Sequence, residues 1–274
     1  MSYIFVAKKP DEFQGHPMYN GDTTISGYTC YKMTTSTQYN SSRLSENEIW
    51  FNVWCGCMNN SSYYNIYVYS DSTNVSVRRQ DNTIHKVWIN GNSPASIPHV
   101  DGLFPWQIHV KSGENDGIVE IFRSGELLYS AENINVLNGE PITQVKLTGG
   151  SGSTSMVIRD AIVATHKIPC GQLLEEVSSD ISAIKGWTQD GDALSTETAG
   201  ASFTIKPNAA SLASLQDKAI HGLAAVFTGT ASDNVSSVNV NNDETLQLLT
   251  KSNTVVGKVR ELSEVTAGLT VTAG

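Results

Sequence analysis

The sequence has little charge, and most of the charge it has is negative. Only 16% of its 274 residues are Asp, Glu, Lys or Arg, against about 25% in an average soluble domain, and the formal net charge is −9. No basic cluster is longer than the pair Arg78-Arg79. A surface that holds a phosphate backbone needs more clustered positive charge than this, so we expect no nucleic-acid partner.

Long apolar runs are also missing. No segment approaches the ~18 apolar residues that a membrane-spanning helix needs. The N-terminal sequence MSYIFVAKKPDEF lacks the basic flank and apolar centre of a secretory signal. We therefore expect no membrane partner, and synthesis in a cytoplasm.

The four cysteines do not have the spacing of a zinc site. Cys55 and Cys57 lie on one expected strand, where their side chains point the same way. We expect buried thiols, with a metal site or a disulfide as the alternatives. The histidines are dispersed and lack a partner at ligand spacing, so surface or strand positions are expected for His16, His85, His99, His109, His166 and His221.

The sequence also contains none of the common catalytic motifs. It has no G-x-S-x-G, no H-E-x-x-H, no phosphate-binding loop and no dinucleotide-binding fingerprint. We therefore assign no catalytic residue and predict that the protein is not an enzyme.

Ser, Thr, Asn and Gly take the place of the missing charge, and they separate short runs that alternate between apolar and polar residues. Asn90-Gly91 and Ser124-Gly125 are typical tight turns, which favours antiparallel hairpins. The clearest candidate strands are 49–57 (IWFNVWCGC), 64–69 (YNIYVY), 74–79 (NVSVRR), 83–90 (TIHKVWIN), 106–111 (WQIHVK), 117–123 (GIVEIFR), 141–147 (PITQVKL) and 155–164 (SMVIRDAIVA).

The pattern changes after residue 166 and then becomes β-like again. Residues 169–186 read as a linker with one short helical turn at most, and the last ~90 residues alternate weakly among many Ala, Thr and Ser. We predict an all-β chain with helix below ~10%: a jelly-roll β-sandwich over 1–168, a linker over 169–186 and a smaller β-sandwich domain over 187–274.

Several short motifs resemble concanavalin A-like jelly rolls of the laminin-G and pentraxin type. The strand 106–110 (WQIHV) is followed by a tight turn and a second strand, as in that family, although the next turn is Ser124-Gly125 instead of the usual Asp-Gly. The strand 156–164 is similar to the family's last strand, with Asp160 near its middle. The junction 186–193 (GWTQDGDA) is similar to one found in tailed-bacteriophage structural proteins that join such a sandwich to a second β domain.

The resemblance implies that two further activities should be considered, glycoside hydrolysis and calcium binding. β-Glucanases of the same clan carry Glu-x-Asp-x-x-Glu on one strand; here Glu114, Asp116 and Glu120 come nearest, but Val119 breaks the pattern and we expect 114–117 to be a turn. Calcium is the clan's other ligand, but no binding-loop pattern accompanies the acidic turns, so we expect solvated turns and no cofactor, with calcium at these turns as the alternative. The acidic turn residues are Asp71, Asp81, Glu114, Asp116, Asp190 and Asp192.

Aromatic residues give the candidate site. If Ile49, Phe51 and Val53 face the core, the alternate residues of their strand face outward, and the same holds for the next strand. Such a surface would pack against another subunit or domain or would bind a glycan, which in lectins of this clan lies on the concave sheet face; plain core is the third reading. The candidate binding residues are Trp50, Asn52, Trp54, Tyr63, Asn65, Tyr67 and Tyr69.

The resemblance implies a bacteriophage virion protein: a fibre, spike, decoration or tail component that self-associates and adheres to host glycans. We expect a homo-oligomer, with a trimer as the best single guess by analogy with phage fibres, and contacts with other virion proteins. The alternative is a polysaccharide-degrading glycoside hydrolase of the same clan.

Overall fold

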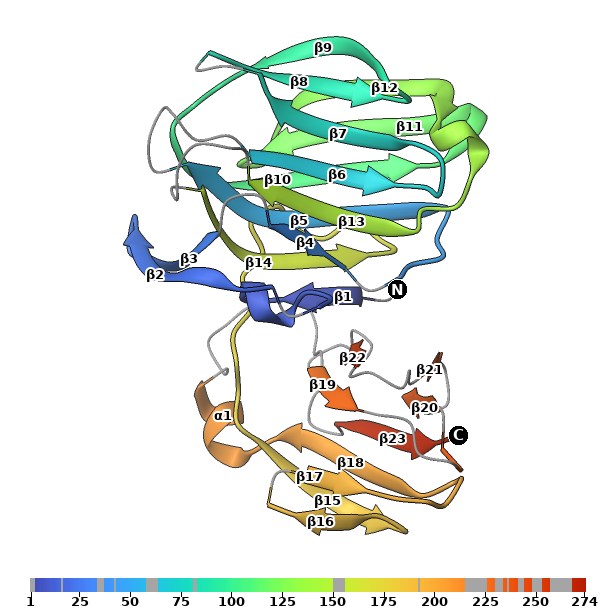
Figure 1. Cartoon of the computed structure of the whole chain (residues 1–274). Coiled ribbons are helices and arrows are strands. Elements are labelled where there is room, and N and C mark those ends of the chain that lie inside the picture. Colours follow the sequence, from blue (N-terminus) through green and yellow to red (C-terminus); the bar gives the residue numbers. More distant parts are fainter. Residues whose placement is uncertain are drawn as a thin grey trace. The chain divides into compact units, whose positions relative to one another are not determined.

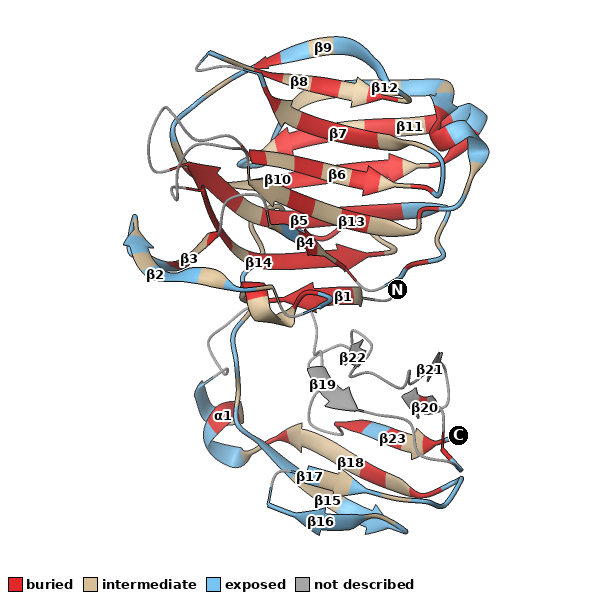
Figure 2. Ribbon diagram, in the orientation of Figure 1, coloured by how far each residue is buried: buried red, intermediate tan, exposed pale blue. Residues whose placement is uncertain are grey.

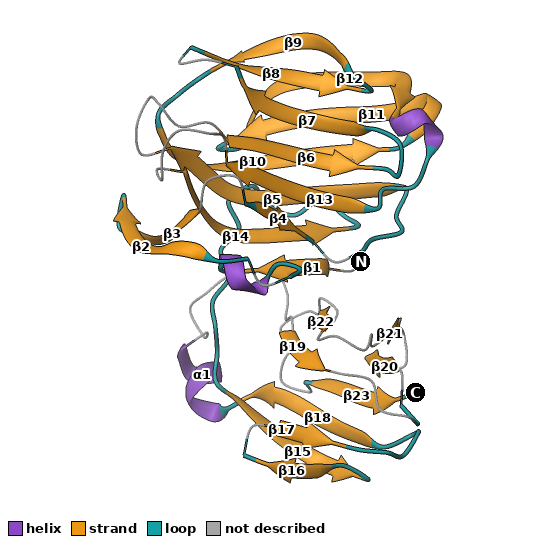
Figure 3. Cartoon of the chain, in the orientation of Figure 1, coloured by secondary structure: helices purple, strands orange, loops and turns teal. Residues whose placement is uncertain are grey.

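The computed structural model describes most of the first two thirds of the chain and shorter segments of the last third. Both parts are built from strands joined by loops, with few helical turns (Figures 1 and 3). The described residues are 3–15, 17–33, 37–41, 43–57, 64–80, 83–149, 156–191, 193–214, 226–229, 234–235, 237–240, 244–247, 253–256 and 268–274.

The chain divides into two compact units, and the first comprises Ile4–Leu174. Its strands form two antiparallel sheets that face one another (Figure 1). The first, sheet A, has the order β12 (Glu126–Val136), β11 (Gly113–Arg123), β10 (Gly102–Lys111), β5 (Glu48–Cys57), β14 (Met156–Ala164), β3 (Tyr28–Met33) and β2 (Tyr19–Ile25), with β1 (Tyr3–Ala7) also paired to β14. The second, sheet B, has the order β4 (Gln38–Asn40), β13 (Gln144–Gly149), β6 (Tyr64–Tyr69), β7 (Asn74–Arg79), β8 (Ile84–Ile89) and β9 (Asn92–Pro98).

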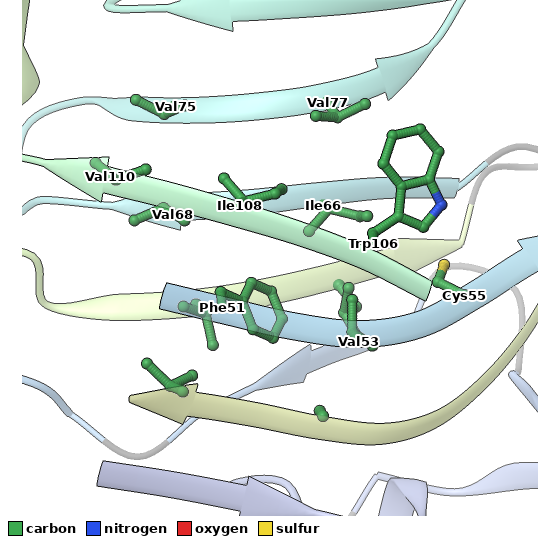
Figure 4. Packing of buried hydrophobic residues seen from close by; sticks show 14 of the residues in the cluster. Phe51, Val53, Cys55, Ile66, Val68, Val75, Val77, Trp106, Ile108 and Val110 are labelled. Carbon is green, nitrogen blue, oxygen red and sulfur yellow. The ribbon is translucent and has the colours of Figure 1, made fainter. Parts of the chain in front are cut away.

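The core lies between the two sheets and is supplied by alternate residues. Phe51 and Val53 of β5 meet Ile66 and Val68 of β6 across the sandwich, and all four are at most 1% exposed (Figure 4). Buried and partly exposed positions therefore alternate along β6 and β8 (Figure 2). This confirms the core faces expected for the strands at 49–57 and 64–69.

β9 and β12, two of the strands that the sequence did not indicate, have little alternation of their own. β9 contains two prolines and is an edge strand of sheet B, and β12 is an edge strand of sheet A. An edge strand tolerates proline and polar residues because one side of its backbone needs no ladder partner. The pattern that identifies a central strand is thus weak in both.

The turns are partly as expected. Asn90-Gly91 and Ser124-Gly125 have positive φ at both residues, which is the geometry of two-residue hairpins. The expectation that 114–117 forms a turn holds in part. The chain reverses between Lys111 and Ile118, the last residues that pair between β10 and β11, but 113–117 also belong to β11 and pair with β12 through irregular register.

The second unit, from Glu175 to Gly274, is smaller and more exposed. Its described core consists of two small clusters that share Trp187 at their margin: Phe203, Val238, Leu269 and Val271 form one, and Ala201, Val235 and Ala273 form the other. Its strands are β15 (Ser179–Lys185), β18 (Ser202–Pro207), β23 (Leu269–Ala273), β20 (Ser237–Val240) and β21 (Glu244–Gln247) in one sheet, with the pairs β16 (Thr188–Asp190) and β17 (Ala193–Ser195), and β19 (Val226–Gly229) and β22 (Asn253–Val256).

The expected linker is partly structured. β15 begins at Ser179, inside 169–186, and pairs with β18, so the second unit starts earlier than the sequence pattern indicated. Helical structure in the described chain is restricted to α1 (Ala209–Ser214) and the 3-10 turns η1 (Pro10–Glu12) and η2 (Leu137–Gly139). None of the described helices has the length and apolar character that would cross a membrane.

Candidate functional site

The structure does not bring the candidate aromatic residues together on one sheet. Trp50, Asn52 and Trp54 lie on β5 of sheet A, whereas Asn65, Tyr67 and Tyr69 lie on β6 of sheet B. Since the core-facing residues of both strands point into the same interior, these two groups point out on opposite sides of the sandwich. Tyr63 lies outside the described residues. The single surface expected from the sequence is thus two surfaces.

On sheet A, the chain itself covers the outer face of β5. Residues 167–171, which follow β14 and which we call the covering segment, contact this face along its length. Lys167 Nζ lies 5.1 Å from the ring centre of Trp50, and the Gln107 amide donates a hydrogen bond of 2.7 Å to the carbonyl of Ile168 and one of 3.1 Å to Asn52. Trp50 is 7% exposed and Asn52 2% exposed, so neither is available to a sugar or a subunit.

Trp54 lies at the other end of the same face and is half-buried. Its indole N–H donates a hydrogen bond of 3.3 Å to the carbonyl of Gly171, and its ring packs against Tyr28 with the centroids 5.1 Å apart. The covering segment therefore satisfies the polar atom of this indole as well.

Sheet A also carries an acid–base cluster that the sequence pattern did not indicate. His109 stacks on Trp50 with the ring centres 3.9 Å apart, and each of its ring nitrogens lies 2.8 Å from a carboxylate oxygen, one of Glu48 and one of Glu120. The three residues come from β10, β5 and β11. The cluster depends on strand register, which spacing in the sequence does not reveal.

The residues that come nearest to the β-glucanase pattern do not form one group. Glu120 is held by His109, while Asp116 pairs with Lys111 at 2.8 Å. The Lys111 ammonium lowers the pKa of the Asp116 carboxyl, mainly through this hydrogen bond. The carboxyl groups of Asp116 and Glu120 thus bind different partners and do not form a catalytic pair.

On sheet B, the outer face presents aromatic rings, amides and cations in register. We call this surface the platform. Directly opposed residues on β13, β6, β7 and β8 form one row, Lys146, Tyr67, Ser76 and Trp88, and a parallel row contains Thr148, Asn65, Arg78 and Lys86. Both rows are read from the pairing of neighbouring strands, so their members lie on the same face.

Arg78 lies between the two main rings of the platform. Its guanidinium carbon is 5.2 Å from the ring centre of Tyr67 and 5.0 Å from that of Trp88, over the small side chain of Ser76. Ser76 and Asn74 accept hydrogen bonds from Arg78 Nε and Nη2 at 2.8 and 3.1 Å. A guanidinium has five N–H groups, so three remain to bind an incoming ligand.

The second aromatic pair of the platform is Tyr67 with Tyr69. Their rings stack with centroids 5.4 Å apart, and Lys146 Nζ lies 4.7 Å from the centre of the Tyr69 ring. Burial raises the pKa of Tyr69 and lowers the pKa of Lys146, because both lose hydration of their charged form at this face. An anion beside Lys146 would restore favourable interactions to its ammonium group.

The platform continues into a shallow pocket of about 330 Å³ beside Tyr69. The pocket is polar, and its two opposite charges, Arg43 and Asp71, pair at 3.1 Å. Its lining residues are Gln14, Arg43, Tyr69, Ser70, Asp71, Thr143 and Gln144.

Of the predicted site residues, Asn65, Tyr67 and Tyr69 belong to the platform, and each is half-buried. Sequence reasoning missed Trp88, Arg78 and Lys146. The alternation of 83–90 (TIHKVWIN) and 141–147 (PITQVKL) already put Lys86, Trp88 and Lys146 on the side away from the core. The order of the strands in sheet B, which places these residues on one continuous surface, could not be read from the sequence.

The described residues contain no group of three His, Cys, Asp or Glu side chains arranged to hold a metal ion. Of the acidic turn residues, Asp71 and Asp116 are paired with Arg43 and Lys111, and Asp81 and Asp192 fall outside the described residues. The cysteines carry thiols and form no disulfide among themselves. Burial raises the pKa of Cys57 to about 11, so this side chain is a poor source of thiolate.

Comparison with known proteins finds similarity in structure only. No family model matches the chain, and no curated protein matches it either. An endo-β-1,4-glucuronan lyase from the fungus Trichoderma reesei is 12% identical, with a TM-score of 0.39, over 59% of this chain and 95% of that one. The CBM2 module of the evolved Dit protein of Lactobacillus casei BL23 phage J-1 is 8% identical, with a TM-score of 0.39, over 59% and 94%.

A β-glucanase from Bacillus licheniformis is 10% identical, with a TM-score of 0.35, over 61% of this chain and 94% of that one. At such identities and TM-scores the similarity supports no conclusion about function. The structure itself has the fold expected from the sequence: an all-β chain with a two-sheet jelly-roll sandwich and a second, smaller β domain.

Proposed function

We propose that the protein is a non-enzymatic structural component of a bacteriophage virion that self-associates and adheres to a surface glycan through the platform. One observation carries the adhesion part of the proposal. Tyr67, Tyr69 and Trp88 are half-buried rings on one sheet face, with amide and cationic donors between them. The equivalent face of sheet A is closed by the covering segment.

The chemistry of the platform suits sugars. A flat aromatic ring offers an apolar face to the C–H groups of a pyranose, and the side chains beside it offer hydrogen bonds to hydroxyl groups. Asn65 and Gln144 supply amides in the rows on either side of Tyr67. An open sheet face of this size binds weakly, and a multimeric virion protein compensates because tethered copies raise the effective concentration.

The proposal that the protein is not an enzyme is supported by the composition of sheet B. Retaining hydrolysis requires two carboxyl groups held about 5–5.5 Å apart beside the sugar. No strand of sheet B, from β4 through β9, contains an aspartate or a glutamate in its described sequence. A glycan bound to the platform would therefore contact hydrogen-bond donors and aromatic rings, but these strands would not supply the two carboxyl groups that hydrolysis requires.

A polysaccharide-degrading enzyme is the second candidate, and one observation favours it. Glu48 and Glu120 flank His109 on sheet A, and Glu48 is 47% exposed at its side chain. Such a cluster could exchange a proton with a substrate. The covering segment lies on the neighbouring residues Trp50 and Phe122, and this favours a packing role for the cluster.

Binding of purified bacterial surface polysaccharides, neutral and acidic, tests the adhesion proposal. We expect binding by the intact chain, at least tenfold weaker binding by Trp88→Ala, and no new reducing ends. Trp54→Ala is the matched control, because it removes an equally half-buried indole from the opposite sheet.

A chain that binds none of the polysaccharides would defeat the adhesion proposal. New reducing ends that disappear in Glu120→Gln would establish the enzyme instead. Portal, capsid or tail genes beside the coding sequence would support the virion setting, and their absence would oppose it.

A further inference from the structure

The charge of sheet B is opposite in sign to that of the whole chain. The protein has 27 acidic and 18 basic residues, yet the strands of sheet B contain basic residues and no acidic ones. Arg78, Lys86 and Lys146 all lie on its outer face. The acidic strand residues of the first unit, such as Glu48, Glu120 and Asp160, belong to sheet A.

Two of these cations directly oppose one another. Arg78 of β7 pairs in register with Lys86 of β8, on the same face and on adjacent strands. Like charges in this position destabilise a sheet, and they are normally relieved by a carboxylate nearby. None of the ion pairs found among the described residues joins an acid to Arg78, Lys86 or Lys146, so the repulsion is left for a ligand to relieve.

The cations are also interleaved with the rings. Arg78 lies within 5.2 Å of the centres of both Tyr67 and Trp88, and Lys146 lies within 5.8 Å of those of both Tyr67 and Tyr69. Tyr67 and Trp88 are two strands apart, roughly 10 Å at an interstrand spacing of about 4.8 Å. A sugar ring packed on this surface would thus lie beside a cation.

We infer that the ligand of the platform is an anionic polysaccharide whose pyranose rings pack on Tyr67, Tyr69 and Trp88 and whose acidic groups pair with Arg78, Lys86 and Lys146. This inference rests on the proposed glycan-binding function and narrows its ligand class. Arg78 is the central contact, because its planar guanidinium keeps unused N–H groups for a carboxylate or a phosphate. The chain's overall charge of −9 would repel such a polymer elsewhere.

Binding measurements with four defined polymers test the inference in the full-length protein. Polyglucuronate carries carboxylates, a phosphomannan carries phosphates, a neutral β-glucan carries no charge, and polyacrylate carries carboxylates without sugar rings. We expect polyglucuronate or the phosphomannan to bind at least tenfold more tightly than the β-glucan and the polyacrylate, and the binding to weaken as salt is raised. Which of the two anionic polymers binds better identifies the anionic group.

Two variants with the same change in net charge locate the site. Arg78→Gln should weaken binding of the anionic polymer roughly tenfold, the effect of removing one charge-assisted hydrogen-bonding group. Lys111→Gln, on the outer face of sheet A, should leave it unchanged. Thermal melts of both variants exclude a loss of folding as the cause.

The outcomes separate this inference from the proposed function. Tight binding of the neutral β-glucan that survives Arg78→Gln would overturn the inference and leave glycan adhesion standing. Absence of binding to every polymer would overturn both. Equal binding of polyacrylate and polyglucuronate would show a surface that attracts any polyanion, and loss of self-association in Arg78→Gln would make the platform a subunit interface; either result overturns the inference.

Discussion

Among the single residues, the most unusual is a histidine that is buried in the interior of the sandwich without a hydrogen-bond partner. His85 is fully buried on β8, and neither of its ring nitrogens has a hydrogen-bond partner in the structure. The rings of Tyr64, His99 and Trp106 surround it at centroid distances of 5.1, 4.9 and 5.3 Å. Burial, with a smaller effect of His99, lowers the pKa of His85 from 6.5 to about 3.

This pKa makes the first unit sensitive to acid. Between pH 6.5 and about 3 the unfolded chain binds a proton that folded His85 does not, so the contribution of His85 to stability is complete above pH 6.5 and is lost as the pH falls. We expect the unfolding free energy of His85→Phe to decline less steeply with acid than that of the wild type, by up to about 1.4 kcal/mol per pH unit. Urea melts at pH 7, 6, 5 and 4 measure the two slopes, and parallel slopes would contradict the assignment.

Among the structural elements, the covering segment closes the outer face of sheet A to ligands. It follows the last strand of the jelly roll and lies back over β5 and β10, where it forms hydrogen bonds with Gln107 and Trp54. Gly171 has φ of +83° in this segment, and a Cβ there would lie 3.3–3.4 Å from atoms of Pro105 and Trp54. A glycine at this point allows the close approach.

Gly171→Ala tests whether the covering segment contributes to stability. The variant combines backbone strain of about 1 kcal/mol with crowding against Pro105 and Trp54. Gly91→Ala is the matched control, since Gly91 has φ of +82° with open space around its Cβ position. We expect a lower melting temperature for Gly171→Ala than for Gly91→Ala, and a blue shift or quenching change in tryptophan fluorescence only for Gly171→Ala. Equal melting temperatures would show that the segment is loosely packed.

At the scale of the whole molecule, the two units differ in how much apolar surface they bury. The first has a continuous core between two sheets, whereas the described part of the second has a small core, and β15 and β16 are largely exposed. A small core gives little stability by itself, and burial against other copies is one remedy. For this reason we propose that the protein is a homo-oligomer, and specifically a trimer.

The assembly proposal predicts a melting temperature that depends on concentration. Because association stabilises by mass action, the transition of the second unit should move to lower temperature as the protein is diluted from about 100 µM to about 1 µM. Light scattering over the same range should show a mass that is a multiple of 29.6 kDa. A monomer at every concentration, with an unchanged melting temperature, would refute the proposal.

Local sequence patterns were sufficient to predict the fold class and the direction of most side chains in the central strands. Alternation depends on local backbone geometry, in which neighbouring side chains point to opposite faces, so Phe51 and Ile66 could be assigned to the core without knowledge of the partner strands. The same local rule put Trp50 and Tyr67 outside the core. Tight turns such as Asn90-Gly91 were recognisable for a similar reason, because positive φ is a property of few residues.

The outer face that is open could not be predicted from these local patterns, because it depends on contacts between distant segments. Trp50 and Tyr67 have the same local pattern, yet the first lies under residues 167–171 and the second lies on the platform beside Arg78. Strand order joins Lys146, Tyr67 and Trp88 from segments far apart in the sequence, and register puts His109 between Glu48 and Glu120. Hydrogen bonding between strands sets these neighbours, and the energy of one pairing over another depends on the whole core, which no local pattern contains.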